Sequence, residues 1–217
     1  MSKQIPYDRE KPYNQLPLLP PEEEKIITIR VMQALNNANR ALAELKGLAR
    51  KLPNQSMLVN TIALREAKAS TEIENIFTTD DELYKSLTYK ESDIKGGAKE
   101  VLFYRQALWS GYHLIKKNEE FSNELIVKVY QIVKEVNDSI RPDQTETVIM
   151  KRGSGLLGSS IVYTPPRGKL IIQTKLDNLY DYLNNADKYP HAPLIKLALS
   201  HYQFEAIHPF RDGNGRA

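Results

Sequence analysis

The sequence predicts a mainly α-helical protein that carries a single β-hairpin. Apolar residues recur at intervals of three and four through most segments that follow residue 21, which is the spacing of one helix face. The exception begins near residue 145, where TVIM and SSIVYT are short and rich in β-branched residues. The glycine-containing GSGLLG separates them, so two strands joined by a turn are expected.

The N-terminal quarter predicts an extended arm followed by a helix. Residues 1–20 contain four prolines and little apolar periodicity, which favours an arm without helices. Pro21 then suits the first turn of a helix, with Glu22–Glu24 close to its positive end. One apolar stripe follows until Pro53 closes the helix, and it consists of Ile27, Val31, Leu35, Ala38, Leu42 and Leu45.

Three capping signals predict the next helices. Ser56 can cap a helix through Ala69, Thr79 with Glu82 resembles a capping box, and Ser122 precedes a further apolar run. Gly96-Gly97 breaks the chain ahead of a longer amphipathic helix. We therefore expect an arm at 1–20, an N-terminal helical region at 21–95 and a core at 96–217.

The C-terminal region predicts two helices that follow the hairpin. Pro165-Pro166 and Gly168 end the second strand, and helical spacing returns at about 173–184 and at 191–207. Apolar residues cover nearly every side of the last helix, a pattern that is typical of burial. We therefore expect this helix at the centre of its domain, on the basis of Leu194, Ile195, Leu197, Ala198 and Leu199.

Composition limits the possible function. The 217 residues are 41% hydrophobic and 26% charged, as in ordinary soluble proteins, and the net charge of +3 does not indicate a nucleic-acid partner. The absence of cysteine excludes disulfides, thiolate zinc sites and a cysteine nucleophile. No signal peptide and no membrane-spanning run is visible, so we expect a cytoplasmic protein without a membrane partner.

The densest concentration of polar chemistry is HPFRDGNGR, residues 208–216. Pro209 disfavours helical geometry at His208, so this histidine should lie where a rigid helix meets a loop. A histidine can act as base or acid at cellular pH. Asp212 is a hard oxygen ligand of the kind that shares Mg²⁺ with phosphates. The simplest alternative for His208 is packing or capping at the helix end.

The glycines of the same stretch suggest an anion site. Gly213 and Gly215 permit backbone conformations closed to other residues, and a helix that starts near Asn214 would present free N–H groups. Arg216 adds a forked cation that suits phosphate oxygens. Together with His208 and Asp212, these residues favour phosphoryl or nucleotidyl transfer, whereas an ordinary turn with a surface arginine is the alternative.

HPFRDGNGR, preceded by SHYQFEAI, resembles the signature of the Fic-domain family: HPF, any residue, Asp or Glu, GNGR, two residues, Arg. The hairpin that ends in VYTPPRG resembles the family's flap over the active site. The resemblance implies a Fic-type helical core with a β-hairpin flap. It also implies transfer of AMP from ATP to a Ser, Thr or Tyr hydroxyl of a target protein, with Mg²⁺.

The resemblance also implies roles for individual residues. His208 would be the general base, Asp212 would hold Mg²⁺, and Phe210 would anchor the loop in the core. The triphosphate would be bound by Gly213, Asn214, Gly215 and Arg216. In the flap, Ile161, Val162 and Tyr163 are candidates for pairing with the target's backbone or for lining the nucleotide pocket. The alternative is that these three side chains pack beneath the hairpin.

STEIEN, residues 70–75, resembles the inhibitory motif of one Fic class. Ser70, Glu74 and Asn75 match its fixed positions, and a solvated helix end is the alternative interpretation. In that class the glutamate pairs with the second motif arginine and blocks the γ-phosphate position. That arginine would fall three residues after Arg216, so the chain is expected to be cut off after the motif and to have doubtful activity as a fragment.

The sequence therefore predicts an autoinhibited protein adenylyltransferase with an N-terminal helical inhibitory region. Three alternatives stay open: removal of AMP, transfer of another phosphate-containing group, and a regulatory protein that binds ATP without turnover. A homodimer is expected only by analogy with the family.

Overall fold

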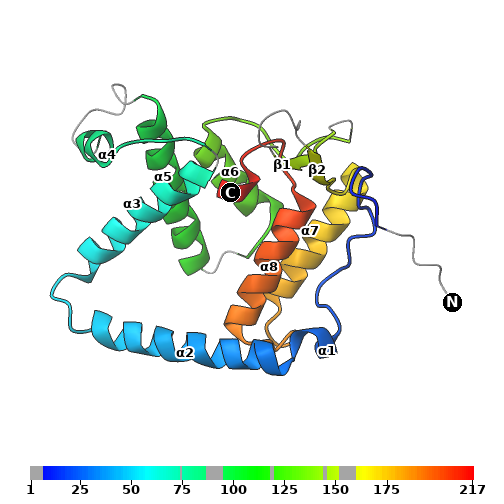
Figure 1. The fold of residues 1–217 in the computed structure, drawn as a ribbon, viewed down its shortest axis with the longest axis horizontal. Coiled ribbons are helices and arrows are strands. Elements are labelled where there is room, and N and C mark those ends of the chain that lie inside the picture. The colour runs from blue at the N-terminus through cyan, green and yellow to red at the C-terminus, as the bar shows by residue number, and fades with distance from the viewer. Residues whose placement is uncertain (1–6, 74, 87–94, 118–119, 144–145, 152–159) are drawn as a thin grey trace. The chain divides into compact units, whose positions relative to one another are not determined.

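The computed structural model describes residues 7–73, 75–86, 95–117, 120–143, 146–151 and 160–217. Helices make up most of these residues, and the two strands form a small antiparallel sheet (Figure 1). The predicted fold class, mainly α with one β-hairpin, is confirmed.

The chain divides into two compact units. The first, the motif unit, combines Met1–Glu23 with Ile140–Asn214, and the second, the helical unit, combines Glu24–Ser139 with Gly215–Ala217. Both units join segments that are distant in the sequence. The expected regions 1–20, 21–95 and 96–217 are each continuous in the sequence, unlike these two units. These regions stay predictions.

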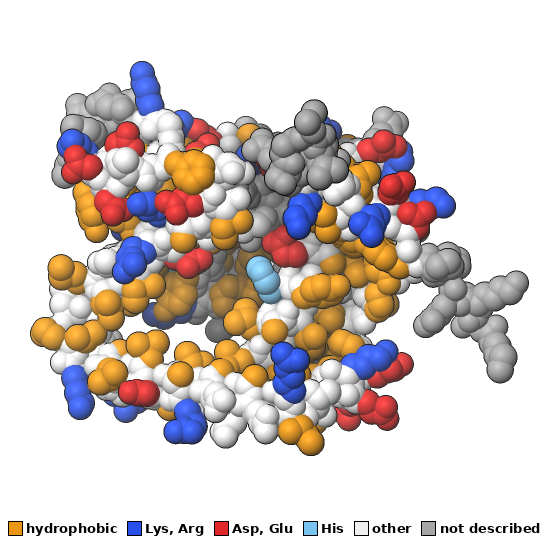
Figure 2. Space-filling model, in the orientation of Figure 1, with side chains coloured by type: hydrophobic (Ala, Val, Ile, Leu, Met, Phe, Trp, Pro, Cys, Tyr) orange, Lys and Arg blue, Asp and Glu red, His pale blue; other side chains and the backbone are white. Residues whose placement is uncertain are grey.

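The start of the helical unit differs from the single helix that the sequence predicted. A short α1 (Glu23–Ile26) is followed by a break, and Thr28 then caps α2 (Ile29–Ala49) by accepting the Val31 N–H at 3.2 Å. A hydroxyl that accepts a backbone N–H at the cap position stabilises the start of a new helix. This cap explains why the chain forms two helices here and not one. No residue of α2 is buried, and Figure 2 shows apolar side chains along this helix.

Local capping chemistry sets the next helix starts. α3 (Gln55–Ile73) begins earlier than expected, because the side-chain oxygen of Asn54, and not Ser56, accepts the Met57 N–H at 3.1 Å. The capping box of α4 (Asp80–Ser86) is confirmed, since Thr79 and Glu82 exchange hydrogen bonds of 3.0 and 3.2 Å. Ser122 caps α6 (Asn123–Lys134), also as predicted.

The core of the helical unit forms around α5 (Gly97–Lys116), which packs against α3, α4 and α6. Its buried cluster contains Leu64, Ala67, Leu83 and Val101. Gly97 permits a close approach at the start of α5, since an added Cβ would lie 2.2 Å from the carbonyl oxygen of Phe77. The first turn of α5 is thereby held against the segment that follows α3.

The motif unit contains the hairpin and two packed helices. β1 (Ile149–Lys151) pairs antiparallel with β2 (Ser160–Tyr163), so that Met150 lies opposite Ile161. α7 (Lys169–Asn184) begins before the expected residue 173 and packs against α8 (Pro193–Ile207). The core of this unit lies largely on α7, where the buried residues include Ile172, Leu176, Leu179 and Tyr182.

The expectation that α8 is buried on nearly every side is wrong. Leu197 is 63% exposed, and the buried residues of α8 form one stripe that consists of Ser200, Gln203, Ala206 and Ile207. Two residues of the stripe are polar, and one of them, Gln203, donates a hydrogen bond of 2.9 Å to the Pro17 carbonyl of the arm. Burial in α8 therefore follows the position of its partners and not its hydrophobicity.

The N-terminal arm lacks helices from residue 7 to residue 20, as predicted, and it is an integral part of the motif unit. Leu16 and Leu19 are buried, and α7 holds their backbones by side-chain hydrogen bonds. Lys175 donates to the Leu16 carbonyl at 2.6 Å, and Asn178 both donates to and accepts from the backbone of Leu19. Burial lowers the pKa of Lys175.

The close approach at Gly97 generates a stability prediction. Gly97→Ala should destabilise the protein by about 1–3 kcal/mol, because the new methyl group must push the Phe77 backbone away. Gly47→Ala is the matched control on α2. Beyond its own helix backbone, no atom of the described residues lies within 4 Å of the place that an added Cβ would take, so this change should stabilise by about 0.5–1 kcal/mol. Urea unfolding followed by circular dichroism measures both, and equal effects of the two variants would contradict the prediction.

Candidate active site

His208 lies at the junction that the sequence predicted. Its N–H donates to the Phe204 carbonyl at 2.9 Å, so it caps α8, and its backbone is left-handed, with φ 51° and ψ 60°. The following proline makes the right-handed helical conformation unfavourable at this residue, which ends the helix here. The imidazole is therefore carried by the last residue of a rigid element and is half-buried.

Two side chains close the loop that follows His208. Phe210 is fully buried, as predicted for the core anchor, with its ring 6.3 Å from that of Phe204. The side-chain oxygen of Asn214 accepts the Phe210 N–H at 2.8 Å, and its amide nitrogen donates to the Phe210 carbonyl at 2.9 Å. This pair of bonds engages both polar ends of the Asn214 side chain.

The glycine and the aspartate of the loop differ in exposure. Gly213 is buried and adopts φ 75°, a left-handed conformation that favours glycine. Asp212 is exposed. A short 3₁₀ turn, η2 (Asn214–Arg216), begins where the sequence analysis expected a helix to start.

Arg141 is a residue that the sequence analysis missed. It is 2% exposed, and its side chain donates from Nε to the His208 carbonyl at 2.8 Å and from Nη2 to the carbonyls of Ile207 and Pro166. Its own N–H donates to the Pro209 carbonyl at 2.9 Å. Nothing in the IRPD context of Arg141 signals these contacts, because their partners lie far along the chain.

The electrostatic environment favours a neutral imidazole at His208. Burial is the main cause that lowers the pKa of this histidine below its usual 6.5, and the charge of Arg141 lowers it further. A hydrogen bond with the Glu205 backbone and the charge of Asp212 act in the opposite direction. A neutral imidazole is the form that can accept a proton.

Arg216 is held within the helical unit by an acidic partner. Its Nη1 lies 2.8 Å from Oε2 of Glu100 in the first turn of α5, and its side chain is 1% exposed. Glu100 is a second residue that the sequence analysis missed. The guanidinium of Arg216 thus pairs with a carboxylate. The expected role in nucleotide binding would require it to pair with phosphate oxygens.

The three candidate flap residues differ in their surroundings. Tyr163 is half-buried, and its hydroxyl donates to the Ala206 carbonyl at 2.8 Å, so this side chain packs beneath the hairpin. Burial raises the pKa of the Tyr163 hydroxyl. Ile161 is half-buried as well, whereas Val162 is 46% exposed. Val162 is therefore the most accessible of the three.

Part of the segment that resembles the inhibitory motif lies at the end of α3, which closes at Ile73. Ser70 donates from Oγ to Glu66 at 3.0 Å, and Glu74 lies outside the described residues. Asn75 has φ 63°, and a 3.0 Å bond from the Ile76 N–H to the Thr71 carbonyl closes the helix end around it. Glycine and asparagine are the residues that tolerate this left-handed position after a helix, which gives a physical reason for the motif's last position.

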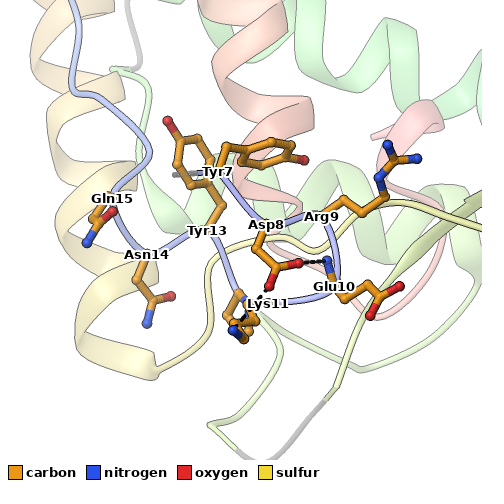
Figure 3. A pocket seen from close by; sticks show the side chains of 9 residues that line it. Tyr7, Asp8, Arg9, Glu10, Lys11, Tyr13, Asn14 and Gln15 are labelled. Atoms are coloured by element: carbon orange, nitrogen blue, oxygen red, sulfur yellow. Dashed lines mark hydrogen bonds and ion pairs between the residues drawn. The ribbon is translucent and has the colours of Figure 1, made fainter. Parts of the chain in front are cut away.

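A surface depression of about 840 Å³ lies on the arm and is lined by residues 7–15 (Figure 3). The rings of Tyr7 and Tyr13 meet edge to face at 5.2 Å, and Asp8 accepts the Glu10 N–H while it pairs with Lys11. No residue predicted for the site lines this depression.

Two further properties concern metals and membranes. The described part of the chain contains no group of three or more His, Asp or Glu side chains that could hold a metal ion. In the same residues, no helix combines the length and the apolar character needed to cross a bilayer.

The surroundings of His208 predict its titration. Because burial disfavours the imidazolium, the histidine should titrate with a midpoint below 6.5. The measurement is proton NMR of the imidazole signals, with the resonance assigned by its loss in His208→Ala. The exposed His201 of α8 is the internal control. A midpoint at or above 6.5 for His208 would contradict the assignment of a neutral base.

Comparisons with known proteins point to one family. The Fic/DOC family N-terminal model matches residues 32–113, and the Fic/DOC family model matches residues 120–217. The second match contains His208 and the whole loop that follows it.

Two kinds of relative match over different shares of the chain. The protein adenylyltransferase and cysteine protease IbpA of Histophilus somni is 24% identical over 209 residues, which are 90% of this chain and 4% of the relative. Protein adenylyltransferase fic-1 of Caenorhabditis elegans is 26% identical over 103 residues, 48% of this chain and 18% of the relative. The chain thus spans a small part of the length of these curated relatives.

A solved structure supports the fold. A fragment of Fic-1 from C. elegans superimposes with a TM-score of 0.59 at 20% identity, and the match covers 89% of this chain and 58% of that one. The two family models together account for most of the sequence. The chain belongs to the Fic/DOC family.

Proposed function

We propose that the protein is an autoinhibited protein adenylyltransferase, which transfers AMP from ATP to a Ser, Thr or Tyr hydroxyl of a target protein. The observation that carries the proposal is His208, a histidine favoured in its neutral form and fixed at the end of α8 immediately before the glycine-containing loop. The relatives named as protein adenylyltransferases support the same reaction class.

The reaction needs one proton acceptor and one displacement at phosphorus. His208 takes the proton from the target hydroxyl, whose oxygen forms a bond to the α-phosphorus of ATP. The bond between that phosphorus and the α–β bridging oxygen breaks, and pyrophosphate leaves with the electron pair. General base catalysis of this kind contributes about 10²–10⁴-fold to a rate.

The loop supplies the proposed phosphate contacts. Gly213 and Gly215 allow the backbone to approach the triphosphate, and Asn214 would contribute its backbone N–H because its side chain binds Phe210. Arg216 would exchange the carboxylate of Glu100 for phosphate oxygens. A substrate that binds here therefore competes with an existing ion pair.

Asp212 fits the proposed magnesium site. It is an exposed carboxylate on the phosphate loop, and Mg²⁺ is commonly bound by one or two carboxylates together with substrate phosphates and water. When bound, the ion would neutralise charge on the phosphates.

The flap would position the target. An extended target segment could pair with the hairpin edge, and the exposed Val162 is the side chain best placed to meet it. Ile161 would line the base of that contact. Tyr163 would support the hairpin from beneath, since its hydroxyl donates a hydrogen bond to the Ala206 carbonyl.

Autoinhibition would come from the segment that ends α3. Glu74 would compete with phosphate for the second arginine of the motif. Ser70 and Asn75, the other two positions of the inhibitory motif, lie near the end of α3. A cytoplasmic location and a homodimer stay predictions. Removal of AMP, transfer of another phosphate-containing group and ATP binding without turnover are the outcomes that would replace the proposal.

The catalytic prediction uses the full-length protein with Glu74→Gly. It should label itself or a partner with α-labelled ATP and Mg²⁺, and His208→Ala should lower that rate by about 100-fold or more. His201→Ala, which alters an exposed histidine of the same helix, is the matched control and should retain the rate. Label from γ-labelled ATP would indicate kinase-like transfer, and ATP binding without label would indicate a regulatory protein.

The inhibitory prediction compares Glu74 with Glu72, two residues earlier in the sequence. Glu74→Gly should raise the labelling rate of the full-length protein by about 5–150-fold, the range expected for a coupling of 1–3 kcal/mol. Glu72→Gly, a change of the same type two residues away, should leave the rate within about twofold. Equal rates for the two variants would remove Glu74 from the inhibitory role.

A further inference from the structure

We infer that Arg141 is a positioning residue for His208, which fixes the backbone of the proposed base and joins it to the base of the hairpin. The inference rests on the proposed function of His208. It concerns a residue 67 positions away in the sequence and outside the HPFRDGNGR motif.

The contacts of Arg141 control the two peptide groups that flank the His208 Cα. The guanidinium donates to the Ile207 carbonyl at 3.2 Å and to the His208 carbonyl at 2.8 Å. The backbone N–H of the same residue donates to the Pro209 carbonyl at 2.9 Å. Three consecutive carbonyls are thus held by one residue, so the peptide planes before and after His208 cannot rotate independently.

The conformation of His208 requires such a hold. Its φ of 51° places a residue with a Cβ in the left-handed region, which is unfavourable relative to ordinary backbone geometry. Conformations of this kind persist only where the surroundings determine them. Arg141 is 2% exposed, so water does not compete for its donors.

A fourth contact extends the same guanidinium to the hairpin. Nη2 also donates to the carbonyl of Pro166, and Pro165 and Pro166 are almost fully buried at the end of the second strand. One planar group therefore sets the position of the helix end relative to the segment that carries the proposed flap. A target hydroxyl aligned by that flap would meet the imidazole in a fixed geometry.

Arginine is the side chain that this arrangement requires. Its guanidinium presents donors in a rigid fork, whereas the lysine ammonium is a single point of charge. Lysine at position 141 would keep the charge and lose the simultaneous hold on Ile207, His208 and Pro166. The conservative variant therefore separates geometry from charge.

The test uses the full-length protein with Glu74→Gly and adds Arg141→Lys or Arg141→Gln. Each folded variant should bind ATP within about twofold of the parent, while labelling at saturating ATP slows by about 10–100-fold, because small misplacements of a catalytic group are costly. Arg167→Gln is the matched control, since this exposed arginine pairs with Glu146 beside the same prolines. The control should label at the parent rate.

Hydrogen exchange supplies a readout that does not depend on activity. The His208 amide should exchange at least about tenfold faster in Arg141→Lys, because the helix end frays when its carbonyls are released. The Leu179 amide within α7 should keep its rate. If the parent gives no label, the proposed function fails, and exchange still tests the hold of Arg141 on His208.

Three results would overturn the inference. The first is a labelling rate per folded molecule within twofold of the parent, and the second is unchanged exchange at His208. The third is a loss of rate that parallels a loss of ATP affinity. Unfolding of both variants would also overturn it, because it would assign Arg141 to the stability of the motif unit alone.

Discussion

The hydrogen bonds between Arg141 and the end of α8 are the interaction on which the candidate site depends. A buried guanidinium is costly unless its donors are satisfied, and here the carbonyls of Ile207, His208 and Pro166 accept from it. Two of these carbonyls belong to the helix end, where the partial negative charge of the helix dipole favours a cation. The guanidinium of Arg141 donates hydrogen bonds to both the left-handed His208 and the buried Pro166, and it thereby stabilises the two together.

The loop after His208 divides its residues between structure and chemistry. Phe210 and Asn214 close the loop on itself, one by burial and the other by two hydrogen bonds to the Phe210 backbone. His208 and Asp212 are the side chains with the chemistry of a base and a hard metal ligand. A short motif can present reactive groups with little freedom because the other residues of the loop fix its shape.

In the helical unit, a carboxylate occupies a position beside an arginine that a phosphate would need. Arg216 is buried against Glu100, so a phosphate that approaches this guanidinium meets a carboxylate that lies 2.8 Å from Nη1. The proposed inhibitory glutamate would act by the same principle at another arginine. The left-handed Asn75 lies two residues beyond the end of α3, so the helix end and the residues of the proposed inhibitory motif are close in the sequence.

The sequence by itself determined the features that depend on neighbouring residues. These include the capping box of Thr79 and Glu82, the Ser122 cap, the hairpin and the helix exit that Pro209 imposes at His208. It also identified the family, because the motif is contiguous. Only the tertiary structure decided that Arg141 holds His208, that Glu100 pairs with Arg216 and that α8 buries a single stripe. These contacts join residues far apart in the chain, and neither apolar periodicity nor capping preference contains information about such partners.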